Sequence, residues 1–150
     1  MPQPLTAEQR TAFLQEPHVA VMSVATSDGH PPYATPIWYA YDAGADRLMI
    51  MTFTEEARLS RKVRLLQEAG QLSLCMQREE LPYKYVAVEG SIEQLDMPAT
   101  QDQILPIVLR YLPAEMAQGF YAMQTATPGR VCARFVIRPD RWDSLDFAEG

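Results

Sequence analysis

Residues 19–41, VAVMSVATSDGHPPYATPIWYAY, hold the pattern that decides the fold. Two runs rich in β-branched and aromatic residues, 19–26 and 33–41, lie on either side of a Ser-Asp-Gly-His turn. Asp-Gly between two such runs is a strong hairpin signal. A third run at 47–53 follows another short turn that contains a glycine. The first half of the sequence therefore predicts an antiparallel meander rather than parallel strands joined by crossover helices.

The second half adds three further strand patterns, at 71–77, 83–93 and 130–138, and the last continues into an extension that carries Trp142. Apolar and polar residues alternate along these patterns, as they do in strands with one buried face. Gly90 interrupts the middle pattern and indicates a bend or a bulge. A meander of this length must cover its edges. We therefore expect a single domain with a mainly β fold, a closed or nearly closed antiparallel barrel of six strands with peripheral helices.

Four segments carry the signals of helices. A capping-box sequence, Thr-Ala-Glu-Gln, opens a short helix over residues 6–15. A second helix is expected over 55–68, where apolar residues spaced by three and four form one stripe and a glycine follows the end. A third pattern runs from 98 to 112 and contains Pro106, which predicts a kink or a restart. A fourth helix is expected over 114–123.

The composition excludes several classes of function. The net charge is -6, so a general nucleic-acid surface, which needs many Lys and Arg on one face, is not expected. No apolar run approaches the ~18 residues of a membrane helix and the N-terminus resembles no export signal, so we expect a cytoplasmic protein without a membrane partner. His18 and His30 have no thiol or carboxylate at ligand spacing, which predicts no metal site. Cys75 and Cys132 lie within strand patterns and are expected to be buried, reduced thiols.

A basic run in this acidic chain marks a candidate anion site. Residues 58–64, RLSRKVR, hold four of the 13 basic residues in seven positions. They lie between an expected strand and the body of an expected helix, and the first-turn N–H groups and dipole of a helix both favour negative charge. The alternative is a solvated helix face, which is the usual role of a charge run. The basic members are Arg58, Arg61, Lys62 and Arg64, and Ser60 supplies a hydroxyl.

The sequence contains none of the common catalytic motifs. There is no Gly-rich phosphate loop, no Gly-x-Ser-x-Gly elbow and no His-Glu-x-x-His pair. Little side-chain machinery is therefore available for hydrolysis or nucleophilic catalysis. An anion site with few acid–base groups is better suited to hold a cofactor that carries its own chemistry.

The order of several short motifs resembles the pyridoxamine 5'-phosphate oxidase-like split-barrel family, which includes FMN oxidases and reductases that use the deazaflavin coenzyme F420. The resemblance runs over about residues 6–142. It rests on an Asp-Gly turn at 28–29, Ala-Thr-Pro-Ile-Trp-Tyr at 34–39, a strand that ends in Thr52, Ser-Arg-Lys at 60–62 and Val-Ala-Val-Glu-Gly at 86–90.

The resemblance implies a homodimer of six-stranded FMN-binding split barrels, with noncovalent FMN or F420 in grooves at the dimer interface. It also assigns roles to residues. Ser60, Arg61 and Lys62 correspond to the contacts of the cofactor phosphate, with Arg58 and Arg64 as accessories that could meet a carboxylate tail. Met51 and Thr52 correspond to positions beside the ring and ribityl chain, Pro36, Ile37 and Trp38 to a strand that flanks the ring, and Tyr85 to a residue that holds the cofactor from the other subunit.

Departures from the family pattern narrow the expected function. The Arg-x-x-Leu-Leu-Lys strand of true pyridoxamine phosphate oxidases is replaced by Thr-Pro-Ile-Trp-Tyr-Ala at 35–40, and residues 138–142 do not match their substrate-phosphate segment. The Pro-Ile-Trp-Tyr strand looks more like the deazaflavin-utilising branch, although Leu65 stands where that branch often has Asn. We therefore expect hydride transfer between F420 or FMN and a small conjugated or heterocyclic substrate. The alternatives are a non-catalytic carrier of flavin, deazaflavin or haem, and a ligand-free dimeric interaction barrel.

Overall fold

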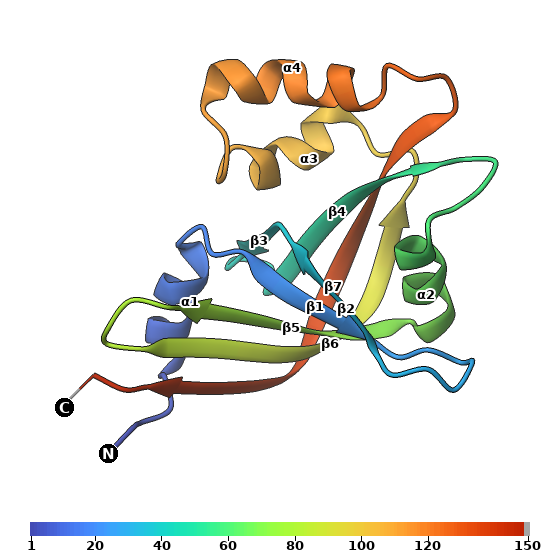
Figure 1. Cartoon of the computed structure of the whole chain (residues 1–150). Coiled ribbons are helices and arrows are strands. Elements are labelled where there is room, and N and C mark those ends of the chain that lie inside the picture. The colour runs from blue at the N-terminus through green and yellow to red at the C-terminus, as the bar shows by residue number, and fades with distance from the viewer. Residues whose placement is uncertain (149–150) are drawn as a thin grey trace.

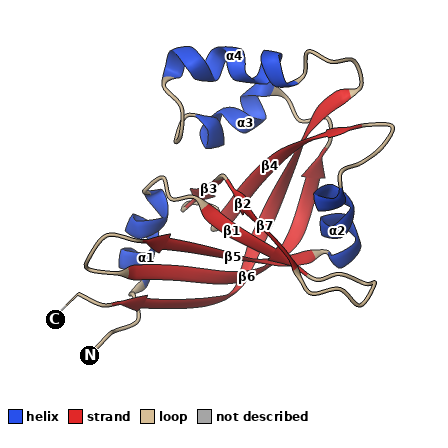
Figure 2. Ribbon diagram, viewed as in Figure 1, coloured by secondary structure: helices blue, strands red, loops and turns tan. Residues whose placement is uncertain are grey.

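Within residues 1–148, which the computed structural model describes, seven antiparallel strands form one sheet in the order β2-β1-β5-β6-β7-β4-β3 (Figure 2). The prediction of a mainly β, antiparallel fold is confirmed, but the sheet has seven strands rather than six. The strands are β1 (Ala20–Val24), β2 (Tyr33–Ile37), β3 (Tyr39–Asp42), β4 (Arg47–Glu55), β5 (Gln71–Arg78), β6 (Lys84–Asp96) and β7 (Arg130–Asp146).

The extra strand arises because the run at 33–41 is broken at Trp38. Its first part, β2, pairs with β1, and its second part, β3, pairs with β4 from Tyr39 opposite Ile50. The two parts are the two opposite edges of the sheet. Because a single residue links the edges, they must lie close together, and the sheet curls into a half-barrel (Figure 1). The predicted meander is thus wrong at this one connection.

Four helices lie outside the sheet in the described part of the chain: α1 (Ala7–Gln15), α2 (Arg61–Ala69), α3 (Gln101–Val108) and α4 (Ala114–Gln124). The capping box before α1 is confirmed, because Gln9 N donates to Thr6 Oγ1 at 3.2 Å and Thr6 N donates to Gln9 Oε1 at 2.9 Å. The third helix is shorter than expected. It begins after a second capping box at Thr100, keeps Pro106 inside it and ends at Val108.

The start of α2 differs from the predicted start at residue 55. Strand β4 continues to Glu55, and the helix begins only after Ser60. Ser60 is the N-cap: its Oγ accepts a hydrogen bond from Val63 N at 3.3 Å, and its own N–H donates to Thr54 Oγ1 at 2.8 Å. The predicted end is confirmed, because the helix closes at Gly70 in the left-handed conformation with φ of 68°.

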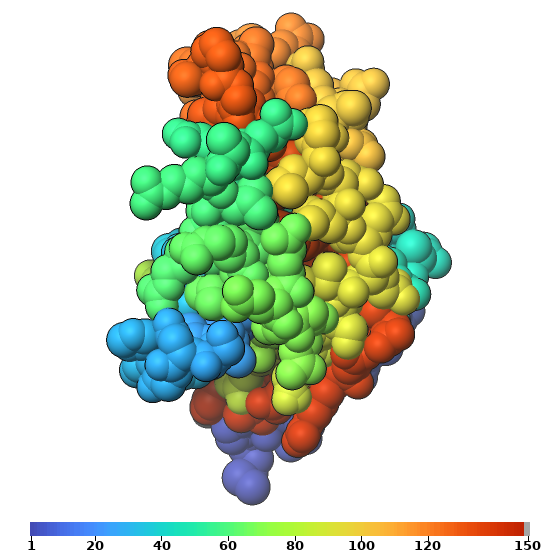
Figure 3. All heavy atoms as spheres, turned by 90° about the vertical axis from the view of Figure 1, so that its right-hand side faces the viewer, coloured from blue at the N-terminus to red at the C-terminus, as the bar shows by residue number. Residues whose placement is uncertain are grey.

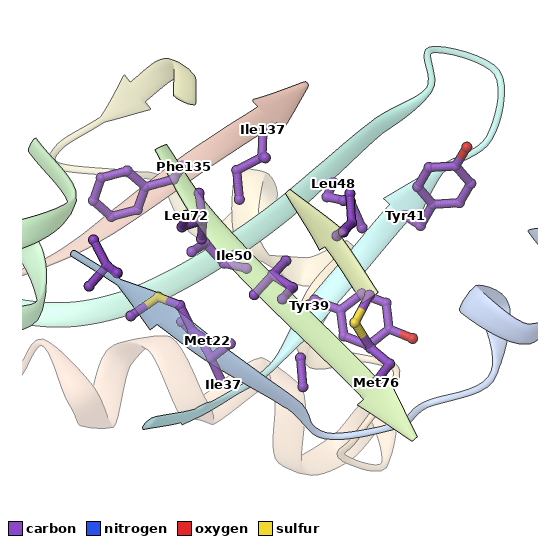
Figure 4. Packing of buried hydrophobic residues seen from close by; sticks show 14 of the residues in the cluster. Met22, Ile37, Tyr39, Tyr41, Leu48, Ile50, Leu72, Met76, Phe135 and Ile137 are labelled. Atoms are coloured by element: carbon purple, nitrogen blue, oxygen red, sulfur yellow. The ribbon is translucent and has the colours of Figure 1, made fainter. Parts of the chain in front are cut away.

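The main core fills the concave face of the sheet (Figure 4). Its largest side chain is Tyr39, which is fully buried and whose hydroxyl donates to the Leu14 carbonyl oxygen at 2.9 Å. Such a buried hydroxyl needs a partner, and this bond ties α1 to β3. The labelled members in Figure 4 include Met22, Ile37, Leu48, Ile50, Leu72, Met76, Phe135 and Ile137.

A second, smaller core lies under α3 and α4, which sit together at the top of Figure 1 beside β4. It includes Cys132, so this cysteine is buried as predicted. The prediction for Cys75 is wrong, because Cys75 is exposed. Along β5 the apolar residues Leu72, Leu74 and Met76 take the inner face, so the residues between them must point outward.

Strands β6 and β7 form the longest pairing in the sheet, and its register slips at the predicted position. Glu89 lies opposite Arg141 but Gly90 lies opposite Pro139, so Asp140 is an extra residue on β7. The two backbones approach closely here: a Cβ atom on Gly90 would lie 2.5 Å from Ile137 Cγ2 and 2.9 Å from the Arg138 carbonyl oxygen. None of the helices formed by residues 1–148 is both long enough and apolar enough to span a lipid bilayer.

Candidate functional site

The half-barrel is split between β2 and β4, and this split is the candidate site. Strand β3 pairs with β4 only as far as Ile50, so beyond this residue β4 is paired on its β7 side alone. On the other side of the split, β2 is paired only with β1. Unpaired strand edges present backbone N–H and C=O groups that a ligand can use.

A hollow of about 280 Å³ lies at this split. Six residues predicted from the sequence as cofactor contacts line it: Pro36, Ile37, Trp38, Met51, Thr52 and Lys62. The residues come from β2, the link to β3, β4 and α2, so four separate parts of the chain meet here. The remaining walls are Val19, Phe53 and Phe120, which sequence reasoning did not identify.

The first turn of α2 gives the hollow a positive charge. This turn contains no acidic residue, and Lys62 is half-buried at the hollow. Burial lowers the pKa of the Lys62 ammonium from its ordinary value of 10.5, because a half-buried charge is poorly solvated. A helix N-terminus that carries a partly desolvated cation is a favourable place for phosphate.

The cations around this turn have no carboxylate partners in the described part of the chain. Within residues 1–148, no salt bridge involves Arg58, Arg61, Lys62 or Arg64. Other cations of the chain are neutralised: Arg134 binds Asp96 at 2.7 Å, and Lys84 lies 3.5 Å from Asp146. Within residues 1–148, four basic side chains near the start of α2 therefore have no carboxylate that neutralises them.

The structure separates Arg61 from Lys62. Arg61 is exposed, and its guanidinium carbon lies 5.2 Å from the centre of the Tyr33 ring. It lines a second, open hollow of about 490 Å³ together with the tip of the β1–β2 hairpin, including Asp28 and His30. Figure 3 shows this tip in blue beside α2 in green. Arg58 and Arg64 are exposed and line neither hollow.

Tyr85 is not at the hollow of its own chain. It lies on β6 with its side chain half-buried, 6.2 Å between ring centres from Tyr83. Its strand neighbours Val86 and Val88 take the inner face, so Tyr85 belongs to the outer face of the sheet.

That outer face carries small or apolar side chains that remain accessible. Val21 of β1 pairs with Cys75 of β5, which pairs with Ala87 of β6, so the three form one row across the sheet. Val21 is 44% exposed and Cys75 is also exposed. The row continues to Asp143 of β7, so its apolar part is the stretch from Val21 to Ala87. Accessible small and apolar side chains of this kind on a sheet face are a candidate contact surface for another protein chain.

Groups for acid–base chemistry are scarce at the hollow. None of the described residues that line it is a histidine or a carboxylate. His18 lies elsewhere, stacked on Phe13 at 4.2 Å, and burial lowers its pKa. In the part of the chain that the structure describes, no three His, Cys, Asp or Glu side chains gather as a metal would require. The arrangement can bind and orient an anionic, planar ligand.

Comparisons with known proteins find solved structures with the same fold. An F420 reductase of known structure is 22% identical, with a TM-score of 0.63 over 88% of this chain and 94% of that chain. A FAD-binding protein from Mesorhizobium loti is 19% identical, with a TM-score of 0.60 over 97% of this chain and 96% of that chain. HutZ, the haem storage protein from Vibrio cholerae, is 13% identical, with a TM-score of 0.62 over 93% of this chain and 94% of that chain. At these identities the likeness concerns the fold.

No curated protein sequence matches the chain. The sequence profile of the pyridoxamine 5'-phosphate oxidase family, however, matches residues 6–142. Because this match covers nearly the whole chain and the solved structures share its curled sheet, the protein belongs to the pyridoxamine 5'-phosphate oxidase family of split-barrel proteins.

Proposed function

We propose that the protein is an oxidoreductase that holds noncovalent FMN or coenzyme F420 at the split and transfers a hydride between this cofactor and a small conjugated or heterocyclic substrate. The observation that carries the proposal is the hollow between two unpaired strand edges, beside a half-buried lysine that has no carboxylate partner within residues 1–148. When bound, the flavin or deazaflavin supplies the site that gives or accepts the hydride.

The residues of the split fit such a cofactor in two parts. Lys62, Arg61 and the Ser60 hydroxyl would hold the phosphate together with the first-turn N–H groups of α2, since Arg and Lys are both suited to phosphate. The open edges at Pro36, Ile37, Met51 and Thr52 would meet the ring and ribityl chain with backbone groups. Trp38 would cover the ring with an apolar side chain and exclude water. Arg58 and Arg64 remain accessories for a carboxylate tail.

The proton that accompanies hydride transfer would come from solvent. The described lining holds no histidine or carboxylate, and the hydroxyl of Tyr111, whose ring stacks on Trp38, already donates to the His18 carbonyl oxygen at 2.7 Å. The side chains of the hollow are therefore assigned to binding and orientation.

We also propose that two copies associate through the outer sheet face, so that Tyr85 of one copy reaches the cofactor of the other. The row of Val21, Cys75 and Ala87 supports this, because small side chains let two sheets pack closely. The hollow of one chain is also small for a whole cofactor, which favours a site completed by a second chain.

Val21→Glu is expected to convert the dimer into a monomer or to raise its dissociation constant by about a hundredfold. The reason is that burying the new carboxylate in the interface, near the same residue of the other copy, costs several kcal/mol. Each loss of about 1.4 kcal/mol of binding free energy raises the dissociation constant tenfold. The measurement is the mass in solution by sedimentation velocity over a range of concentrations. Leu109→Glu is the matched control, because Leu109 is 51% exposed at the end of α3. Equal masses for wild type and Val21→Glu would contradict the proposed interface.

Cofactor affinity is expected to fall as the pH rises towards the lowered pKa of Lys62. Burial makes this lysine lose its proton at lower pH than an exposed lysine, and the charged form is the one that attracts phosphate. Titrations between about pH 7 and 10 measure the effect. Lys62→Arg should retain its affinity over this range, because a guanidinium stays charged. An identical pH profile in the two proteins would remove Lys62 from the phosphate site.

A second candidate function is the binding of flavin, deazaflavin or haem without turnover, which is favoured because no described residue of the hollow is a histidine or a carboxylate. Haem is the weakest of these ligands, since the hollow's lining among residues 1–148 includes no histidine to hold its iron. The experiment that separates the two functions mixes protein loaded with reduced cofactor with enones, quinones and tetrapyrroles under anaerobic conditions. Reoxidation faster than that of free cofactor supports the oxidoreductase. Binding without reoxidation across the panel supports the carrier.

A further inference from the structure

Three aromatic side chains from three parts of the chain form one wall of the hollow. Phe120 of α4 lies 5.9 Å from Trp38 and 5.7 Å from Phe53, measured between ring centres. The Trp38 and Phe120 rings are tilted by 32°, and the Phe53 and Phe120 rings meet nearly edge to face at 72°. Rings at these separations attract each other and leave faces that a further planar group can contact.

This wall is braced from behind. Trp38 stacks on Tyr111 at 4.7 Å with only 8° between the ring planes. The Tyr111 hydroxyl donates to the His18 carbonyl oxygen at 2.7 Å and accepts a hydrogen bond from Tyr39 N at 3.3 Å. These bonds fix Tyr111 against β3, so Trp38 is held in one orientation. A surface that is rigid before binding loses little entropy when a ligand stacks on it.

Phe120 continues into an apolar stripe along α4. Met116, Phe120 and Met123 are spaced by four and three residues, so they share one face of the helix. The adjacent face points to the small core, where Ala117 is buried. Met116 and Met123 are 57% and 69% exposed. Methionine is flexible and makes favourable contacts with aromatic rings, which suits a surface that receives planar molecules.

We propose that α4 is the substrate-selecting wall of the site and that the substrate is a planar, apolar molecule that stacks against Phe120 and extends over Met116 and Met123. This inference rests on the proposed oxidoreductase function. The stripe is continuous with the hollow, because Phe120 belongs to both. A second copy of the chain is a poorer occupant, since three side chains on one helix are far fewer than the 20–30 residues a side of a typical stable interface.

The test is equilibrium dialysis of menadione, a planar quinone, and of cyclohexenone, a small non-aromatic enone, against protein loaded with oxidised cofactor, which cannot reduce either ligand. Wild type is expected to bind menadione at least about tenfold more tightly than cyclohexenone. Phe120→Ala should weaken menadione binding about tenfold, the loss expected for one aromatic contact, while cyclohexenone affinity, measured with the cofactor site saturated, stays within about twofold. Met116→Glu with Met123→Glu should weaken menadione binding several-fold.

Two controls keep the outcome interpretable. Phe120→Leu retains apolar bulk against Trp38 and Phe53, so it should fold like wild type and still lose most of the preference for menadione. Gln118→Ala changes an exposed position on α4 outside the stripe and should change nothing.

Equal menadione binding by wild type and both Phe120 variants would overturn the proposal. The proposal would also be overturned if the variant with Met116→Glu and Met123→Glu changed the mass of the assembly but bound menadione as wild type does. That result would make the stripe a protein interface. A failure of the proposed oxidoreductase function is distinguishable from these results, because wild-type protein would then bind neither FMN nor F420 in a titration.

Discussion

Replacing Arg61 and Lys62 together with alanine is expected to weaken cofactor binding by about a hundredfold or more. Each residue would lose a charge-assisted hydrogen bond to the phosphate, worth about 1.5–3 kcal/mol, and a factor of ten corresponds to about 1.4 kcal/mol. The dissociation constant from a fluorescence titration measures the effect. The fold should persist, because Arg61 is exposed and neither side chain forms a salt bridge within residues 1–148.

Arg47→Ala with Arg138→Ala is the matched control for this double variant. It removes the same number of charges from residues that line neither the hollow at the split nor the open hollow beside Arg61. Its effect on the cofactor dissociation constant should stay within about threefold, in keeping with the weak, screened influence of remote surface charges. If both double variants lose affinity equally, the net charge of the protein and not the start of α2 controls binding.

Gly90→Ala is expected to lower the free energy of unfolding by about 1–3 kcal/mol, the range found when atoms are forced into a packed site. The added Cβ would lie 2.5 Å from Ile137 Cγ2 and 2.9 Å from the Arg138 carbonyl oxygen, so β6 and β7 must move apart. For a chain of this size each kcal/mol lowers Tm by about 2–4 °C. Thermal and urea melts of the wild type and the variant measure the change.

Gly119→Ala provides the matched control, since it makes the same substitution with the opposite expected sign. Gly119 lies inside α4, and apart from the adjacent residues and the helix's own backbone no described atom lies within 4 Å of the position that its Cβ would take. Alanine should therefore stabilise the protein by about 0.5–1 kcal/mol through helix propensity. A Gly90→Ala variant as stable as wild type would show that the β6–β7 bulge adapts without cost.

The fold class could be predicted from the sequence because turns and alternation are local properties. The Asp-Gly turn and the alternating runs 71–77 and 130–138 each indicate a strand from neighbouring residues alone. The break at Trp38 could not be predicted in this way. Both halves of the run at 33–41 are strand-like, and only the long-range pairing of one half with β1 and the other with β4 separates them.

Part of the candidate site could also be predicted from the sequence. Lys62 and the β2 and β4 residues were identified from a charge run, its strand–helix context and a family resemblance. The start of α2 could not be predicted, because residues 55–59 suit a helix as well as a loop. The hydrogen bond from Ser60 N to Thr54 Oγ1 decides between them and makes Ser60 the N-cap. Phe120 lies far along the chain in a weakly patterned helix, and no local signal connects it with the split.

The most direct test of the central claim is a side-by-side equilibrium titration of the wild-type protein with FMN and with coenzyme F420. If the split is a cofactor site, at least one of the two binds with a dissociation constant in the micromolar range or below, with one cofactor per chain. If neither binds at micromolar concentration, the assignment of the hollow between β2 and β4 as a flavin or deazaflavin site is wrong.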